Sequence, residues 1–316
     1  MQNSISLVAS LPHYEHHLRP IWEKMPVSMK GGEFLGEEYR LRTQRSTDVI
    51  LVAGYADVKR SPIHKFVFVE HGAGQSYVGL DRSVRAYYSG GNAHQNCLMF
   101  LCPNQEVADR WLARYPDKPA VVVGSPRLDP WHAGLRGENE PRTVAVTFHW
   151  DANFTGCPET TSAFGYYLEN LQDVVIGWRR KGWHVIGHNH PRHTALAQFW
   201  QGPDMAPYVE YVADGAEVLD RAHILVADNT SMQAEFLSLG RPVVWLNHPS
   251  YRRDVDHGGR FWTWPRTYGG LEVCGPAELA AVDLDSVPSA TGHPYAFADG
   301  QAAQRAADAI VSLLER

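Results

Sequence analysis

The sequence has few cysteines, no long apolar run and no excess of positive charge. Its 316 residues include 4 cysteines and no Cys-x-x-Cys pair, which argues against a disulfide framework and against a thiolate metal site. No apolar run approaches the roughly 20 residues that a bilayer-spanning helix needs. The start of the sequence lacks the basic and apolar segments of a secretory signal. We therefore expect a soluble, cytoplasmic protein with reduced thiols and no integral membrane association.

The charge balance and the apolar content further limit the class of protein that this sequence can encode. Lys and Arg total 29 and Asp and Glu total 35, so the formal net charge is −6. A general nucleic-acid binder normally carries a basic field, which this chain lacks. Hydrophobic residues make up 44% and charged residues 20%, the composition of a folded rather than a disordered chain. The length is enough for about two domains.

Short apolar runs alternate with longer segments of helical period, which is the pattern of parallel α/β sheets. The first half predicts strands at 48–53, 66–70, 98–101 and 120–123, and helices at 13–23 and 105–115. The second half predicts strands at 143–148, 184–186, 209–212, 224–227 and 242–246, and helices at 164–181, 216–221, 232–239 and 301–314. Between the halves, residues 134–141 are polar, contain glycine and end in proline, like a domain linker.

Two doubly wound domains place a cleft between the carboxyl ends of two parallel sheets, where ligands of such sheets bind. The residues after each predicted strand are therefore the site candidates. His71 follows 66–70, and its imidazole titrates near neutrality, so it could act as a general base. The alternative is a histidine bonded within a glycine-rich turn. Arg127 follows 120–123 and could bind phosphate or carboxylate, or could simply pair with Asp129.

Two further strand ends are followed by histidine and arginine side chains. Residues 187–193 contain three histidines, but a proline interrupts them and no carboxylate stands at ligand spacing. We favour a polar loop over a metal site there, with His190 and Arg192 as donors to an anion. Arg252 and Arg253 follow the predicted strand at 242–246 and could clamp a diphosphate. The alternative for this pair is a solvated basic turn.

The strongest local signal is the turn at 228–231, which leads from a buried strand into a helix. Thr230 and Gln233 have the spacing of a capping box. Backbone amides at the positive end of that helix, with the hydroxyls of Thr230 and Ser231, would make an anion site. An ordinary helix cap without a ligand is the alternative.

Taken in order, these segments resemble the CDP-glycerol glycerophosphotransferase family, the TagB/TagF-like teichoic-acid polymerases and primases, over about residues 50–250. The matching segments are His71-Gly72 for a His-Gly motif, Gly124 to Asp129 for Gly-x-Pro-Arg-x-Asp, His190-Pro191 for His-Pro, and Asp228, Asn229, Thr230 and Ser231 with Glu235 for Ser-Asp-x-Ser-Ser…Asp/Glu. The family has the GT-B glycosyltransferase fold, which consists of two Rossmann-like parallel-sheet domains facing an interdomain cleft.

The resemblance implies that the two domains bind different substrates. Residues 1–137 would form the acceptor-side domain, 142–298 the nucleotide-donor domain, and 299–316 a terminal helix that can pack back on the first domain. His71 would deprotonate the acceptor, and His190 would offset charge on the departing nucleotide. The donor phosphates would be bound by the remaining candidates, which are Arg127, Asp228, Asn229, Thr230, Ser231, Glu235, Arg252 and Arg253.

We therefore expect a metal-independent transferase that moves a glycosyl or glycerol-phosphate-type group from a CDP- or UDP-linked donor to a hydroxyl. The acceptor would be a glycan, a polyol phosphate, a protein or a modified nucleic acid, and no cofactor beyond the donor is expected. Residues 148–151 read Phe-His-Trp-Asp where the family often has Pro-Thr-Trp-Arg, so another CDP-alcohol or a nucleotide sugar could be the donor. The alternatives are a nucleotide-sugar 2-epimerase-like enzyme and a non-catalytic nucleotide-binding module.

Overall fold

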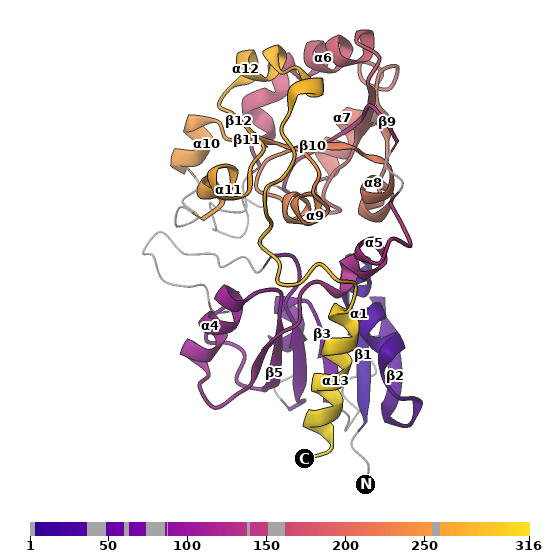
Figure 1. Ribbon diagram of the computed structural model, residues 1–316, viewed down its shortest axis with the longest axis vertical. Helices are drawn as coiled ribbons and strands as arrows, with labels where there is room; N and C mark the ends of the chain where they lie inside the picture. Colours follow the sequence, from indigo (N-terminus) through magenta and orange to yellow (C-terminus); the bar gives the residue numbers. More distant parts are fainter. Residues whose placement is uncertain are drawn as a thin grey trace. The chain divides into compact units, whose positions relative to one another are not determined.

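The computed structural model divides the chain into two compact units. Among the described residues, unit 1 contains those up to residue 135 and those from residue 294 on, and unit 2 contains those between them. The structure describes residues 4–36, 49–59, 63–73, 86, 88–137, 140–150, 162–254 and 260–316. Each unit has its own six-stranded sheet, and the strands of each sheet pair in parallel (Figure 1).

The sheet of unit 1 has the strand order β2-β1-β3-β4-β5-β6. Its strands are β1 (Ile5–Ala9), β2 (Lys30–Leu35), β3 (Val49–Val52), β4 (Phe66–Val69), β5 (Cys97–Cys102) and β6 (Ala120–Val122). Its helices are α1 (Pro12–Lys24), α3 (Tyr55–Lys59), α4 (Gln105–Arg114), α5 (Asp129–His132) and α13 (Ala302–Leu314), with 3-10 turns at Val27–Met29 and Pro126–Leu128. The strand order reverses between β1 and β3, and ligands of open α/β sheets bind at such switch points.

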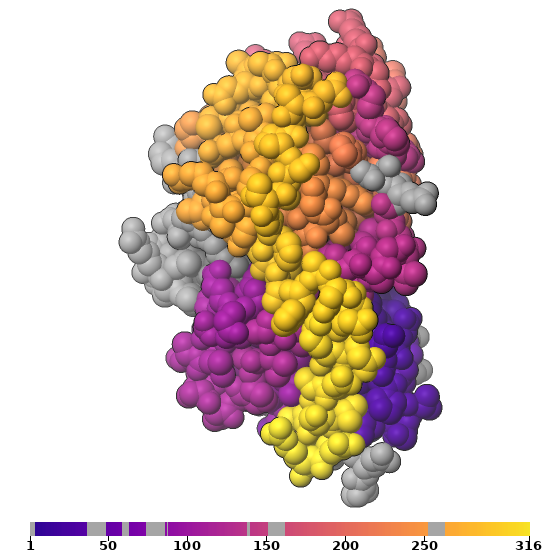
Figure 2. All heavy atoms as spheres, in the orientation of Figure 1, coloured from indigo at the N-terminus to yellow at the C-terminus, as the bar shows by residue number. Residues whose placement is uncertain are grey.

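Helices cover both faces of this sheet. On one face α1 and α13 lie side by side (Figure 1), and Leu18 and Ile310 are fully buried against Leu7. On the other face α3 and α4 pack, and the ring of Trp111 stacks on Phe100 at a centroid distance of 4.2 Å. The outward side of α13, in yellow, lies at the surface of unit 1 (Figure 2). A helix from the C-terminal end of the sequence therefore completes the core of the N-terminal unit.

The sheet of unit 2 has the strand order β12-β11-β10-β7-β8-β9. Its strands are β7 (Thr143–Thr147), β8 (His184–Gly187), β9 (Glu210–Tyr211), β10 (Ile224–Ala227), β11 (Val243–Leu246) and β12 (Leu271–Val273). Its helices are α6 (Phe164–Arg180), α7 (Thr194–Gln201), α8 (Gly215–Arg221), α9 (Met232–Ser238), α10 (Pro249–Asp254), α11 (Arg260–Tyr268) and α12 (Pro276–Ala281), with a 3-10 turn at Leu284–Ser286. This order is that of dinucleotide-binding sheets, with the switch point between β7 and β10.

Helices α6, α7 and α12 pack on one face of the second sheet, and α9 packs against β10 and β11. At the end of β8, a Cβ added to Gly187 would lie 2.6 Å from the fully buried ring of Trp200. The indole N–H of Trp200 donates to the carbonyl oxygen of His188 at 3.0 Å. Glycine at position 187 therefore lets α7 approach the strand closely and fixes the start of the loop that follows β8.

The strands and helices predicted from the sequence are confirmed, with ends that agree to within one residue. The doubly wound α/β class is confirmed as well. The sequence patterns did not predict the strands β1, β2 and β12 or the helices α3, α5, α7, α10, α11 and α12. None of the helices in the described ranges combines the length and the apolar character that a bilayer-spanning helix requires.

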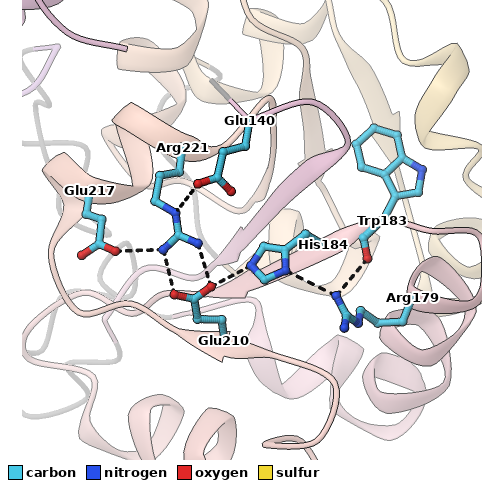
Figure 3. Close-up of polar contacts among 7 residues, drawn as sticks. All are labelled: Glu140, Arg179, Trp183, His184, Glu210, Glu217 and Arg221. Atoms are coloured by element: carbon cyan, nitrogen blue, oxygen red, sulfur yellow. Dashed lines mark hydrogen bonds and ion pairs between the residues drawn. The ribbon is translucent and has the colours of Figure 1, made fainter. Parts of the chain in front are cut away.

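Arg221, at the end of α8, fixes the segment that enters unit 2 (Figure 3). Its guanidinium binds Glu140 at 3.0 Å, Glu217 at 2.8 Å and Glu210 at 2.7 Å. Hydrogen bonds from Arg221 and then from His184 lower the pKa of Glu210 to about 2. The amide of Glu140 also donates to the carbonyl oxygen of Arg221 at 2.8 Å. Residue 140 of the predicted linker is thus attached to unit 2.

Asp129 connects two distant parts of unit 1. Its carboxylate accepts hydrogen bonds from the amides of Ala302 at 2.9 Å and Ala303 at 2.7 Å, in the first turn of α13. A carboxylate at this place satisfies amides that have no partner within the helix and lies at the positive end of the helix dipole. At the same junction Gly124 has a φ of +89°, and a Cβ there would lie 2.6 Å from the carbonyl oxygen of Ala296. This motif therefore holds α13 on unit 1.

We predict that Asp129→Ala lowers the free energy of unfolding by about 1–2 kcal/mol, because it removes the helix cap. Chemical denaturation followed by circular dichroism measures the change. Asp308→Ala is the matched control, because Asp308 is exposed on α13 and, among the described residues, accepts only from the Gln304 side chain, at 2.9 Å. The control should lose only about 0.2–0.5 kcal/mol. Equal losses in the two variants would contradict the capping role.

Candidate functional site

His71 follows β4 at the carboxyl end of the first sheet. Its Nδ1 lies 2.7 Å from the carbonyl oxygen of Ala53, the residue after β3. Because a carbonyl oxygen only accepts hydrogen bonds, Nδ1 carries the ring proton, and the lone pair of neutral His71 lies on Nε2. This tautomer makes Nε2 the basic nitrogen, as a general base requires.

Three rings surround His71. The ring centroid of Tyr55 lies 4.9 Å from that of His71, Tyr14 lies at 5.1 Å and His17 at 6.1 Å. Tyr55 comes from α3 and the other two from α1, so these contacts place His71 beside the switch point of the sheet. No sequence motif links a helix near residue 14 to position 71, so these three residues were not predicted to lie at the site.

Arg127, a predicted phosphate ligand, lies in the 3-10 turn after β6 and acts electrostatically on His17. Burial, and next the charge of Arg127, hold the pKa of His17 well below its usual value, so His17 stays neutral at physiological pH. The ion pair between Arg127 and Asp129 does not form, because the Asp129 carboxylate binds the amides of α13. The structure therefore brings Arg127 and His71 into the neighbourhood of the same imidazole.

Glu70 precedes His71, but its side chain points into the core. It is 4% exposed and accepts hydrogen bonds from the indole N–H of Trp111 at 2.9 Å and from the hydroxyl of Tyr55. Since the ring of Tyr55 also contacts His71, these hydrogen bonds fix a ring against which His71 rests. Glu70 therefore holds the Tyr55 ring that His71 contacts.

Asp228 joins the ends of β7 and β10 at the switch point of unit 2. One carboxylate oxygen accepts from the amide of His149 at 2.6 Å, and the other accepts from the amide of Ala163 at 2.8 Å and the hydroxyl of Ser162 at 3.4 Å. The residue is 1% exposed, and this burial raises its pKa to about 7 although the hydrogen bonds lower it. These contacts hold both sides of the connection between β7 and α6, whereas the predicted contact of Asp228 with phosphate stays a prediction.

The predicted capping box at the start of α9 does not form. The amide of Thr230 donates to the carbonyl oxygen of Asp228 at 2.8 Å, and the side chain of Gln233 donates to the carbonyl oxygen of Ala227 at 3.0 Å. The hydroxyl of Thr230 instead accepts weakly from the amide of Met232, at 3.5 Å. The turn is therefore held by backbone and side-chain bonds to the strand end rather than by a reciprocal cap.

The four other predicted phosphate ligands of this turn differ in exposure. Asn229, Thr230 and Glu235 are buried, with 3%, 9% and 3% of their surface exposed, and Ser231 is half-buried. Asn229, Thr230 and Ser231 precede helix α9, and Glu235 lies within it. Ser231 is therefore the most exposed of these four residues, and their contacts with phosphate stay predictions.

His190 lies in the loop after β8, beside residues that follow β7. Its Nδ1 accepts from the amide of Arg192 at 3.2 Å, so Nε2 carries the proton of the neutral ring. The ring centroid lies 5.9 Å from that of His149 and 5.8 Å from that of Trp150. The ends of β7 and β8 thus contribute one cluster of aromatic and imidazole rings, and the donor group of the neutral His190 ring is its Nε2–H.

Arg252 and Arg253 belong to α10, and their side chains lie outside the described part of the structure. Their role in binding a diphosphate therefore stays a prediction. In the ranges that the structure does describe, no three His, Cys, Asp or Glu side chains gather as a metal-ligand set. The three histidines of the loop after β8 serve other contacts there; for example, Nδ1 of His193 accepts from the amide of Leu196 at 3.2 Å.

Comparison with solved structures identifies the fold. No protein-family model matches the sequence, and no curated protein matches it. A structure of the wall teichoic acid polymerase TagF aligns with 100% of this chain and 90% of that chain, with 12% identity and a TM-score of 0.67. The chain has the GT-B fold.

Other GT-B structures align along the whole chain too. The UDP-GlcNAc 2-epimerase from Methanocaldococcus jannaschii aligns over 100% of both chains, with 12% identity and a TM-score of 0.56. The S. aureus MnaA–UDP structure covers 99% of this chain and 97% of that chain, with 14% identity and a TM-score of 0.58. At these sequence identities, the structural similarity establishes the GT-B fold but not the role of any residue.

The raised pKa of Asp228 predicts a pH-dependent stability. Between its usual pKa of 3.8 and its folded value of about 7, the folded state binds more protons than the unfolded state. The free energy of unfolding should therefore fall through this range as pH rises, with little further change from this group above it. Asp228→Asn removes this titrating group. The free energy of unfolding of wild type, minus that of the variant, should therefore decrease as pH rises through this range.

Urea denaturation at a series of pH values tests this dependence. Glu169→Gln, an exposed change on α6, is the control and should keep the wild-type pH profile. Parallel profiles for wild type and Asp228→Asn would contradict the raised pKa.

Proposed function

We propose that the chain is a metal-independent GT-B transferase that moves a glycosyl or glycerol-phosphate-type group from a nucleotide-diphosphate donor to an acceptor hydroxyl. The observation that carries this proposal is the tautomer of His71. With Nδ1–H bonded to the carbonyl oxygen of Ala53, Nε2 would take the acceptor proton, and the carbonyl would stabilise the imidazolium that forms. The acceptor would be a glycan, a polyol phosphate, a protein or a modified nucleic acid.

Unit 2 would hold the donor at the carboxyl end of its sheet. The hydroxyl of Ser231 would bind a phosphate, and Nε2–H of His190 would offset charge on the departing nucleotide. The location supports this, since nucleotide phosphates bind at the switch points of such sheets. Structures with the same fold include a TagF variant soaked with CDPG and MnaA with UDP. We therefore propose a CDP- or UDP-linked donor and no further cofactor.

A nucleotide-sugar 2-epimerase is the second candidate, because the M. jannaschii 2-epimerase matches over the whole of both chains. An epimerase needs carboxylates at the sugar, and Glu70, the carboxylate next to His71, is bonded to Trp111 and Tyr55. Nuclear magnetic resonance of UDP-GlcNAc incubated with the protein alone distinguishes the two. A C2 epimer without any acceptor favours the epimerase, and acceptor-dependent nucleotide release favours the transferase. Nucleotide binding without either product indicates a non-catalytic module.

We predict that at least one of CDP, UDP and CDP-glycerol raises the melting temperature in a thermal-shift panel. GDP, cytidine and uridine are the comparison compounds of the panel. A ligand at about 100 times its Kd adds about 2.7 kcal/mol, which raises Tm by about 5–10 °C in units of this size. The nucleosides should give small shifts because they lack the phosphates. A panel in which none of these compounds shifts Tm would contradict a nucleotide donor.

His71→Ala should lower kcat by about 10²–10⁴-fold, the usual contribution of a positioned general base, and should leave donor affinity within about twofold. The measurement is nucleotide release from the donor that the panel identifies, together with calorimetry of donor binding. His16→Gln, an exposed change on α1, is the control and should keep wild-type turnover. If His71→Ala retains turnover within about threefold of wild type, His71 is not the base.

A further inference from the structure

The guanidinium of Arg192 lies over the indole of Trp150. Its Cζ is 4.8 Å from the centroid of the Trp150 ring, which is a cation–π contact. Trp150 is 9% exposed, whereas Arg192 is exposed. Since Trp150 follows β7 and Arg192 lies between β8 and α7, the contact joins two loops at the carboxyl end of the second sheet.

The backbone around Arg192 is held in place as well. The amide of Arg192 donates to Nδ1 of His190 at 3.2 Å, and the ring of His190 stacks on Trp150 with an angle of 22° between the planes. The side chain of Asn189 donates to the carbonyl oxygen of His190 at 2.8 Å and accepts from the hydroxyl of Tyr211 at 2.8 Å. A side chain that is ordered before its ligand arrives loses less conformational entropy on binding.

Arg192 differs in its charge partners from three of the arginines of unit 2, Arg136, Arg142 and Arg221. Arg136 and Arg142 each bind an aspartate, and Arg221 binds three glutamates (Figure 3). Within the part of the chain that the structure describes, no carboxylate lies within ion-pair distance of the Arg192 guanidinium. The Asp228 carboxylate at the same end of the sheet accepts hydrogen bonds from backbone amides. A fixed cation without a counter-ion is suited to an anionic ligand.

We propose that Arg192, held on Trp150, binds the phosphate oxygens of a nucleoside diphosphate, with Nε2–H of His190 as a second donor. This inference rests on the proposed function and names the cation that recognises the donor. A guanidinium over an aromatic ring keeps N–H groups available for a ligand, and its planar fork matches two oxygens of one phosphate. Because the contact is to phosphate, it distinguishes a nucleoside diphosphate from its nucleoside and is indifferent to the base.

The test is calorimetry of CDP, UDP and inorganic pyrophosphate with wild type, Arg192→Met and Arg192→Lys. Arg192→Met should weaken the binding of each probe that wild type binds by about 10- to 100-fold, the loss expected for a hydrogen bond to a charged group. Arg192→Lys keeps the charge but not the fork, so its loss should be smaller. Arg180→Met, an exposed arginine at the end of α6, is the control and should bind like wild type. Thermal unfolding without ligand checks that each variant is folded.

The outcomes separate this inference from the proposed function. If wild type binds a nucleotide and Arg192→Met binds it within about twofold, the role of Arg192 is wrong and the proposed function stands. If wild type binds pyrophosphate but no nucleotide, and Arg192→Met loses pyrophosphate, the anion site stands and the nucleotide donor is contradicted. If wild type binds none of the three probes, both are overturned.

Discussion

Parallel pairing of the strands determines where the candidate residues lie. In a parallel sheet the strands all end at the same edge, so loops that are distant in sequence meet there. His71 reaches the carbonyl oxygen of Ala53 across 18 positions, and Asp228 reaches the amide of His149 across 79. Helices bury the faces of each sheet, and polar side chains gather at this edge. The places of the candidate residues depend on this arrangement more than on any single contact.

Each sequence motif contains side chains with different roles: some bind the protein's own backbone, and others do not. In one motif Asp129 and Gly124 attach α13, while Arg127 acts on the imidazole of His17. In another, Asp228 binds backbone amides, while the hydroxyl of Ser231 remains half-buried. Spacing alone cannot separate these tasks, because it does not reveal which side chain turns toward the protein and which turns toward a ligand.

Most elements of the fold were predictable, because central strands are continuous apolar runs and the helices are amphipathic. Strand β1 was missed although it is a buried apolar run between β2 and β3. Strand β2 was not predictable in this way, since it lies at the sheet edge, contains two glycines and alternates between half-buried and exposed positions. The site was predictable only in part. The strand ends gave His71 and His190, but Tyr14 and His17 reach His71 through the packing of α1 on the sheet, which no local pattern encodes. The stack of Arg192 on Trp150 likewise depends on the pairing of β7 with β8.

Helix α13 affects the order in which the two units can be completed during translation. Residues 136–293, which make up nearly all of unit 2, leave the ribosome before α13 does. Until then one face of the first sheet lacks its second covering helix, and apolar side chains such as Leu7 and Leu18 have no Ile310 to pack against. Unit 1 therefore cannot complete its core until unit 2 has been synthesised, and apolar surface that is exposed during such an interval favours misassembly.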